Sequence, residues 1–250
     1  MDTRLIGVFD SGMGGISILR EMTRILPGES FLYYGDNANA PYGTRPKEEI
    51  LRLSRGVVSR LLARDIKALV IACNTATSAA TETLRRELTL PVIGVEPALK
   101  PAALYGGSGA ILVLATPATL RLEKFARLME QYGQRALPVP CPGLMEFVER
   151  GETDSPALHA FLKELLSPYR GTDVAACVLG CTHYPFVRRA IERELPGVPM
   201  FDGSEGTARQ LKRVLEQANL LSGAANGQVL FDSSDASALP RMRALYEMEL

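Results

Sequence analysis

One cysteine, Cys73, lies where an apolar strand is expected to end and a helix to begin. It belongs to the segment ACNTAT, residues 72–77. A thiol in this position meets the unpaired N–H groups and the positive end of the helix, which favour the thiolate. Asn74 and Thr75 add donors suited to a carboxylate. The pattern indicates a reactive thiol beside an anion site, and a small cysteine filling a strand end is the alternative.

A second cysteine, Cys181, occupies a similar position in the second half of the chain. It belongs to the segment GCTHYP, residues 180–185. Thr182 can donate a hydrogen bond to an anion, and His183 can exchange protons near neutral pH. Because two cysteines follow equivalent strands, the pair favours acid–base chemistry more strongly than either cysteine alone.

The first glycine-rich loop reads DSGMGG, residues 10–15. A dinucleotide fingerprint would need a third glycine at the position of Ser17, and the acid Asp10 opposes a phosphate. We therefore expect Asp10 and Ser11 to handle a proton or bind a small ligand, with glycines that permit close backbone approach. The alternative is a tight turn in which Asp10 caps the next helix.

A polar loop, YYGDNANAPYGT, covers residues 33–44. Loops of this kind often carry binding groups above a rigid scaffold, although an ordinary polar connection is the alternative. The candidate binding residues within it are Asp36, Asn37, Asn39, Tyr42, Gly43 and Thr44.

Weaker candidates lie in the second half of the chain. Thr116 and Thr119 follow a strand that mirrors the one before Asp10, and both could contact a carboxylate. Glu149, in a helix expected from Gly143 to Gly151, is either a surface charge or an acid of the cleft. Three other residues are expected to be structural or superficial: Cys177 in a core strand, Cys141 between two prolines, and His159 on a helix surface.

Short β-rich apolar runs alternate with helical patterns throughout the chain. Strands are expected at Leu5–Phe9, Ser30–Tyr34, Ala68–Ala72, Val92–Val95, Ala110–Leu114, Val174–Leu179 and Val198–Phe201. Helices are expected at Pro46–Arg64, Ala76–Leu88 and Leu120–Tyr132, the first of them capped by Thr44. Strands buried on both faces and linked by helices predict parallel α/β sheets.

The two halves of the chain also resemble each other. Thr116 follows Asp10 by 106 residues, and Cys181 follows Cys73 by 108. We therefore expect two similar α/β domains, related by a pseudo-two-fold axis and facing each other across a central cleft. Ligands of open α/β sheets bind at the carboxyl ends of the strands. A last strand and helix, after the linker at residues 222–227, could return to either domain.

Composition excludes several classes of protein. The 250 residues are 46% hydrophobic, and 28 basic residues balance 28 acidic ones. The absence of a basic excess argues against nucleic-acid binding. Because the start lacks a signal-peptide pattern and no apolar stretch could span a membrane, we expect a cytoplasmic protein with free cysteines.

Two thiols with separate partners suit the inversion of a stereocentre. One face of a carbon must lose a proton and the opposite face must gain one, and a single side chain cannot easily reach both faces. No lysine or redox motif suggests an organic cofactor, so we expect no cofactor and no metal.

The motifs together resemble those of the glutamate racemases, within the aspartate/glutamate racemase superfamily. DSGMGG, YYGD with PYGT, ACNTAT and GCTHYP occur in the family's order between about residues 4 and 220. Aspartate racemases are similar at both cysteines, but they typically carry Glu where this chain has His183. In the segment around Glu149, Glu146 stands where the family carries proline.

The resemblance implies roles for individual residues. Cys73 would exchange the proton of D-glutamate with help from Asp10, and Cys181 that of L-glutamate with help from His183. The binding pairs would be Asp10–Ser11, Tyr42–Gly43, Asn74–Thr75 and Thr182–His183. It also implies D-glutamate production for peptidoglycan in a bacterial cytoplasm. The C-terminal segment would complete the first domain, which gives domains of residues 1–96 plus 207–250 and 97–206.

Other classes of protein stay open on the sequence alone. Cys73, Cys181 and His183 could ligate zinc, although the paired cysteine spacing of structural zinc sites is absent. A non-enzymatic binding protein for small anions would not need either thiol, and a cysteine hydrolase would need only one. A homodimer is compatible with the sequence.

Overall fold

The computed structural model describes residues 1–249, and the chain divides into two compact units. Unit 1 comprises Met1–Glu96 and Ser204–Met248, and unit 2 comprises Pro97–Gly203 together with Glu249. Each unit is built on one parallel sheet. The parallel α/β class expected from the sequence is therefore confirmed.

Unit 1 contains a five-stranded sheet in the order β4-β3-β1-β2-β9, with all pairs parallel. Its strands are β1 (Ile6–Asp10), β2 (Phe31–Gly35), β3 (Ala68–Ile71), β4 (Val92–Gly94) and β9 (Val229–Ser233). Its helices are α1 (Ile16–Ile25), α2 (Lys47–Leu62), α3 (Asn74–Glu87), α10 (Ser204–Gln217) and α11 (Leu239–Glu247). Short 3-10 turns lie at η1 (Asn37–Asn39), η2 (Tyr42–Thr44) and η5 (Ala236–Ala238).

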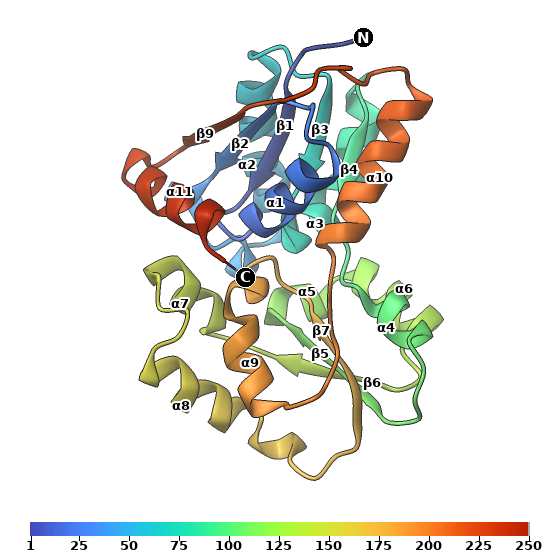
Figure 1. The fold of residues 1–250 in the computed structure, drawn as a ribbon, viewed down its shortest axis with the longest axis vertical. Coiled ribbons are helices and arrows are strands. Elements are labelled where there is room, and N and C mark those ends of the chain that lie inside the picture. Colours follow the sequence, from blue (N-terminus) through green and yellow to red (C-terminus); the bar gives the residue numbers. More distant parts are fainter. Residues whose placement is uncertain (250) are drawn as a thin grey trace. The chain divides into compact units, whose positions relative to one another are not determined.

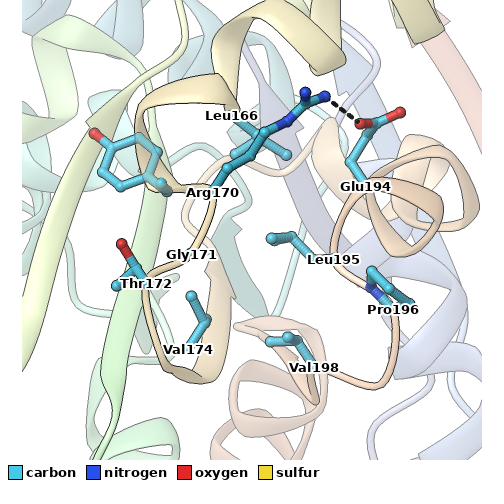
Figure 2. A pocket seen from close by; sticks show the side chains of 10 residues that line it. Leu166, Arg170, Gly171, Thr172, Val174, Glu194, Leu195, Pro196 and Val198 are labelled. Carbon is cyan, nitrogen blue, oxygen red and sulfur yellow. Dashed lines mark ion pairs between the residues drawn. The ribbon is translucent and has the colours of Figure 1, made fainter.

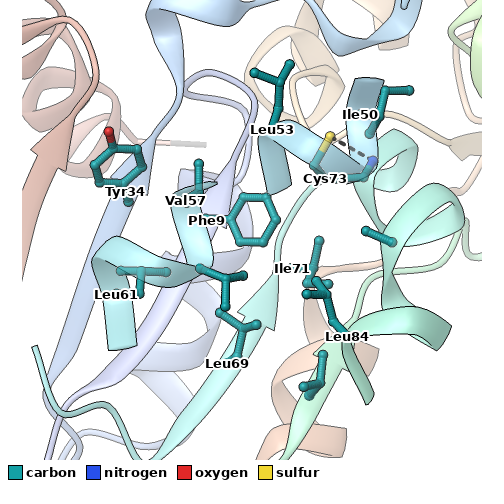
Figure 3. Close-up of a cluster of buried hydrophobic side chains, with 14 of the residues drawn as sticks. Phe9, Tyr34, Ile50, Leu53, Val57, Leu61, Leu69, Ile71, Cys73 and Leu84 are labelled. Carbon is teal, nitrogen blue, oxygen red and sulfur yellow. Dashed lines mark hydrogen bonds between the residues drawn. The ribbon is translucent and has the colours of Figure 1, made fainter. Parts of the chain in front are cut away.

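Helices cover both faces of this sheet, which explains why every residue of β1, β2 and β3 is buried. Helices α2 and α3 pack together on one face, and α1 packs beside α10 on the other (Figure 1). Phe9 and Ile71, from the central strands, meet Val57 and Leu84 of the covering helices in one apolar cluster (Figure 3). Cys73 belongs to the same cluster, so the thiol is held by a packed core and not by a mobile loop.

Unit 2 contains a four-stranded parallel sheet in the order β6-β5-β7-β8. Its strands are β5 (Ala110–Ala115), β6 (Ala136–Pro140), β7 (Val174–Leu179) and β8 (Met200–Asp202). Its helices are α4 (Leu99–Leu104), α5 (Pro117–Arg121), α6 (Glu123–Tyr132), α7 (Leu144–Arg150), α8 (Pro156–Leu165) and α9 (Arg188–Glu194). The 3-10 turns η3 (Ser167–Tyr169) and η4 (Tyr184–Val187) precede β7 and α9 respectively.

The two sheets share a strand order. In unit 1, β1 lies between β3 and β2, and in unit 2, β5 lies between β7 and β6. Strand β4 lies beyond β3 in unit 1, and β8 lies beyond β7 at the corresponding edge of unit 2. Unit 1 has one more strand, β9, beside β2. Asp10 therefore ends β1 and Thr116 follows β5, the corresponding central strand, while Cys73 and Cys181 follow the corresponding neighbours β3 and β7.

Two local expectations are corrected by the structure. No strand was among those expected at residues 136–140, a segment that contains Pro138 and Pro140. The strand forms at the edge of the sheet, where a missing N–H costs no ladder hydrogen bond. Thr44 does not cap α2, since it lies in η2 and Pro46 occupies the cap position before Lys47. Within residues 1–249, no helix is long and apolar enough to cross a membrane.

Candidate functional site

Cys73 lies between strand β3 and helix α3 and caps that helix. Its Sγ accepts a hydrogen bond from the backbone N–H of Ala76 at 3.5 Å. Its side chain also contacts the hydroxyl of Ser11 at 3.6 Å. The thiol is thus tied to the end of β3, the start of α3 and the loop that follows β1.

The carboxylate of Asp10 is fully buried and accepts hydrogen bonds from the loop that follows it. The hydroxyl of Ser11 donates at 3.1 Å, and the backbone N–H groups of Gly12 and Gly15 donate at 3.0 and 2.5 Å. A Cβ at Gly15 would lie 2.9 Å from this carboxylate and 2.7 Å from Ala72 Cβ, so the loop requires glycine there. Asp10 therefore makes the hydrogen bonds expected of a residue that stabilises a tight turn. It is also connected to Cys73 by hydrogen bonds.

That route runs through Ser11. Since the single hydroxyl proton of Ser11 is directed at Asp10, its oxygen is left to accept from the Cys73 S–H. Cys73, Ser11 and Asp10 then form a hydrogen-bonded line along which a proton can move.

Burial changes the expected charge of Cys73. Burial, followed by the neighbouring charge of Asp10, raises the pKa of Cys73 to about 12, although the hydrogen bonds with Ala76 and Ser11 lower it. The sequence-based expectation that the helix end would favour a thiolate is therefore wrong. Desolvation outweighs the helix end, and Cys73 is a thiol at neutral pH.

The other candidates of unit 1 lie close to this line. Asn74 and Thr75 form the first turn of α3 and are buried. Among the described residues, the buried Oδ1 of Asn74 has no hydrogen-bond partner, so it offers a free acceptor at the base of the helix. Tyr42 is buried in η2, and Gly43 beside it is half-buried.

Cys181 follows β7 in unit 2, and its partner is an imidazole. Its Sγ lies 3.6 Å from Nδ1 of His183. On the other side of the ring, Nε2 of His183 lies 2.6 Å from Oε1 of Glu149, which comes from α7. Glu149 was ambiguous in the sequence; the structure ties it directly to His183.

Opposing effects act on the pKa of His183. Burial lowers it, but hydrogen bonds to Cys181 and Glu149 and the charges of both raise it well above its ordinary value. The imidazole is therefore able to hold a proton taken from Cys181 while Glu149 balances its charge.

The remaining residues of unit 2 fall into two groups. Thr116 and Thr119 start α5 after strand β5, with their hydroxyl oxygens 2.9 Å apart, and Thr182 is buried beside Cys181. Three further residues take the structural places expected of them: Cys177 is in the core strand β7, Cys141 is buried after β6, and His159 pairs with Asp154 near the surface of α8.

One open pocket of unit 2 is separate from these candidates. It holds a volume of about 280 Å³ and is lined by Arg170, Thr172, Glu194 and apolar residues before β7 and β8 (Figure 2). None of the candidate residues lines it. In the part of the chain that the structure describes, no three His, Cys, Asp or Glu side chains are arranged to hold a metal ion.

The fold and the two cysteines define a class of protein with two parallel α/β units. Each unit has a cysteine after a corresponding strand. The family model for Asp/Glu/hydantoin racemases matches residues 6–211. The chain belongs to this family.

Individual relatives are also similar over most of the chain. A glutamate racemase of Clostridium perfringens is 48% identical over 222 residues, which cover 87% of this chain and 85% of the relative. A solved glutamate racemase of Thermus thermophilus, in complex with β-chloro-D-alanine, is 38% identical with a TM-score of 0.82, covering 99% and 93% of the two chains. That of Francisella tularensis, in complex with D-glutamate, is 28% identical with a TM-score of 0.84, covering 100% and 96%.

Proposed function

We propose that this chain interconverts L- and D-glutamate by two-base catalysis, without an organic cofactor or a metal. The observation that carries the proposal is that each unit holds one buried cysteine beside its own proton-accepting partner. Cys73 has Ser11 and Asp10, and Cys181 has His183. One such group for each face of a carbon is what the inversion of a stereocentre requires.

Glutamate is the substrate best supported. The Clostridium perfringens relative is a glutamate racemase, and the Francisella tularensis structure contains D-glutamate. In this chain, the free Oδ1 of Asn74 could accept from an ammonium group. The proposed binding groups are Asp10–Ser11, Tyr42–Gly43, Asn74–Thr75, Thr182–His183, Thr116, Thr119 and Glu149.

In the direction from L- to D-glutamate, His183 holds the proton of Cys181, and the thiolate removes the α-proton of the substrate. Cys73 delivers its S–H proton to the opposite face of the carbon. The step leaves Cys181 protonated and Cys73 ionised. The enzyme is restored when a proton returns to Cys73 along Ser11 and Asp10 and Cys181 loses one.

The proposal includes an arrangement of the two units. Residues 1–96 plus 207–250 and residues 97–206 would act as domains facing a common cleft. If each sulfur approaches one α-carbon at roughly 3–3.5 Å, the two sulfurs lie about 6–8 Å apart when substrate is bound. An open form would be wider by a few ångströms.

The biological role follows from the product. D-Glutamate would supply peptidoglycan precursors in a bacterial cytoplasm.

A homodimer is part of the proposal and is tested by sedimentation velocity.

Circular dichroism of D- or L-glutamate incubated with dialysed protein tests the function directly. The signal of either enantiomer should decay to that of the racemate without added cofactor. Activity that disappears with a chelator and returns only with zinc would contradict the cofactor-free mechanism. Binding of glutamate with no decay of the signal would favour a binding protein.

A further inference from the structure

One buried acid of unit 1 has no part in the proposed proton transfers. Asp36 directly follows β2 and is only 3% exposed. Its backbone N–H donates to the carbonyl of Asp10 at 2.9 Å. Its carboxylate accepts from the hydroxyl of Tyr42 at 2.6 Å and from Nδ2 of Asn39 at 3.0 and 3.2 Å. Asp36 thus connects the strand end that carries Asp10 with the loop that carries Tyr42.

The loop between Asp36 and α2 is held from three sides, and on one of them Ser233 and Ser234 after β9 form hydrogen bonds with Asn37 and Ala38. None of the residues in η1 is buried, and in η2 only Tyr42 is buried. The guanidinium of Arg45 holds the far end, since it donates to the carbonyl of Asn39 at 3.0 Å and pairs with Glu49 of α2 at 2.5 Å. Asp36 joins the near end of the loop to β1, because it forms hydrogen bonds with Asn39 and Tyr42 of the loop and with the carbonyl of Asp10.

The contact with Asp36 also sets what Tyr42 can offer a ligand. A phenol has one proton, and this proton is directed at Asp36, so the oxygen retains lone pairs that can only accept. Burial, the hydrogen bond to Asp36 and the nearby charges of Asp36, Cys73 and Asp10 raise the pKa of Tyr42 far above its ordinary value. Tyr42 consequently stays a neutral acceptor, which suits an ammonium group.

We propose that Asp36 is a positioning residue for substrate binding, which holds Tyr42 and Gly43 in place relative to Asp10 and orients the Tyr42 oxygen as an acceptor. The inference rests on the proposed racemisation of glutamate. Asp36 contacts neither thiol in the hydrogen-bond pattern of unit 1. Its loss should therefore weaken binding of both enantiomers and leave the proton-transfer steps largely intact.

The test is the steady-state kinetics of Asp36→Ala with D- and L-glutamate. A hydrogen bond to a charged group is worth enough to change binding about 10- to 100-fold. We expect KM to rise by that factor in both directions, with a much smaller change in kcat. Asp36→Asn keeps an acceptor for the Tyr42 hydroxyl and should recover most of the loss. In a double-mutant cycle, Tyr42→Phe should add little to Asp36→Ala.

Glu29 offers a matched control at the opposite end of the same strand. It precedes β2, is 4% exposed, and pairs with Lys67 at 2.6 Å while accepting from the Ser222 N–H at 2.8 Å. Glu29→Gln disturbs a buried carboxylate of unit 1 without touching the loop. It should lower the thermal stability and leave KM at the wild-type value.

The outcomes separate the inference from the proposed function. An inactive wild-type protein in the same assay contradicts the function. An active wild type with unchanged KM in Asp36→Ala overturns the inference, as does an equal rise of KM in Glu29→Gln. If Asp36→Ala does not fold, Tyr42→Phe decides: a raised KM supports the inference, and an unchanged KM overturns it.

Discussion

The surroundings of Cys73 and Cys181 differ although both cysteines follow corresponding strands and are 6% and 8% exposed. Cys73 caps an α-helix and is linked to the carboxylate of Asp10 through the hydroxyl of Ser11. Cys181 precedes a 3-10 turn and has an imidazole as its direct neighbour. Similar backbone positions and similar burial thus provide different chemistry, because the partner of the sulfur decides where its proton can go.

This difference favours one direction of the proposed reaction, from L- to D-glutamate. Cys73 keeps its proton, since burial raises its pKa to about 12. His183 can hold the proton of Cys181, since its pKa is raised by Cys181 and Glu149 despite burial. A protonated Cys73 together with a proton-accepting His183 matches the proposed conversion of L- to D-glutamate, in which Cys73 donates a proton and His183 holds the proton of Cys181.

Replacing either thiol should produce the largest effect. Cys73→Ser and Cys181→Ser should each lower the rate of racemisation by about 10⁴-fold, the upper end of the range for the loss of one acid–base group. A substrate that eliminates a leaving group after one proton is removed separates the two faces. Cys73→Ser should lose elimination from the D form, and Cys181→Ser from the L form. If both variants lose the same form, the assignment of faces is wrong.

Replacing the partner of each thiol should have the next largest effect. Asp10→Asn and His183→Asn should slow kcat by about 10²–10⁴-fold, with a smaller change in KM. Each should slow most the enantiomer handled by its neighbouring cysteine, because each partner serves one sulfur. Racemisation followed in both directions by circular dichroism measures this. Small and equal losses would assign Asp10 and His183 purely structural roles.

The rates of thiol alkylation should distinguish the two cysteines without substrate. At about pH 8, a thiol with a pKa of about 12 is ionised in roughly one molecule in 10⁴, and only the thiolate reacts. Cys181 should react with iodoacetamide at least about 10-fold faster than Cys73. Peptide mapping by mass spectrometry identifies the modified residue. His183→Asn should slow Cys181 alone, and equally fast reaction of Cys73 in the wild type would refute the comparison.

Removing the charge of Glu149 should have the smallest effect, and it should depend on pH. The raised pKa of His183 stabilises the folded protein fully below the ordinary histidine pKa, and this stabilisation is lost as pH rises through the raised value. Glu149→Gln lowers that pKa, so it should decrease the free energy of unfolding by about 1.5–3 kcal/mol near pH 6 and by less at alkaline pH.

Urea unfolding at a series of pH values measures this dependence. Asp154→Asn is the matched control, because it removes the carboxylate beside the partly exposed His159. If Glu149→Gln decreases the free energy of unfolding by the same amount at every pH, the pair of Glu149 and His183 carries no charge.

Much of the fold could be predicted because its signals are local. Strands such as β7 are continuous apolar runs between turn residues, and the structure places this strand at Val174–Leu179, as expected. Strand β6 could not be predicted, because Pro138 and Pro140 are acceptable only at a sheet edge, and an edge is a property of the assembled sheet.

The sequence alone was sufficient to select the two cysteines and the loop at Asp10 as candidates and to predict the parallel α/β architecture, because motifs and periodicity are local properties of the chain. Only the tertiary structure decided which side chains are in contact. Glu149 meets His183 across 34 positions of sequence, and Ser11 meets Cys73 across 62. It also decided the protonation of Cys73, because the helix end that is visible in the sequence favours a thiolate, whereas desolvation by surrounding side chains exists only once the core has formed.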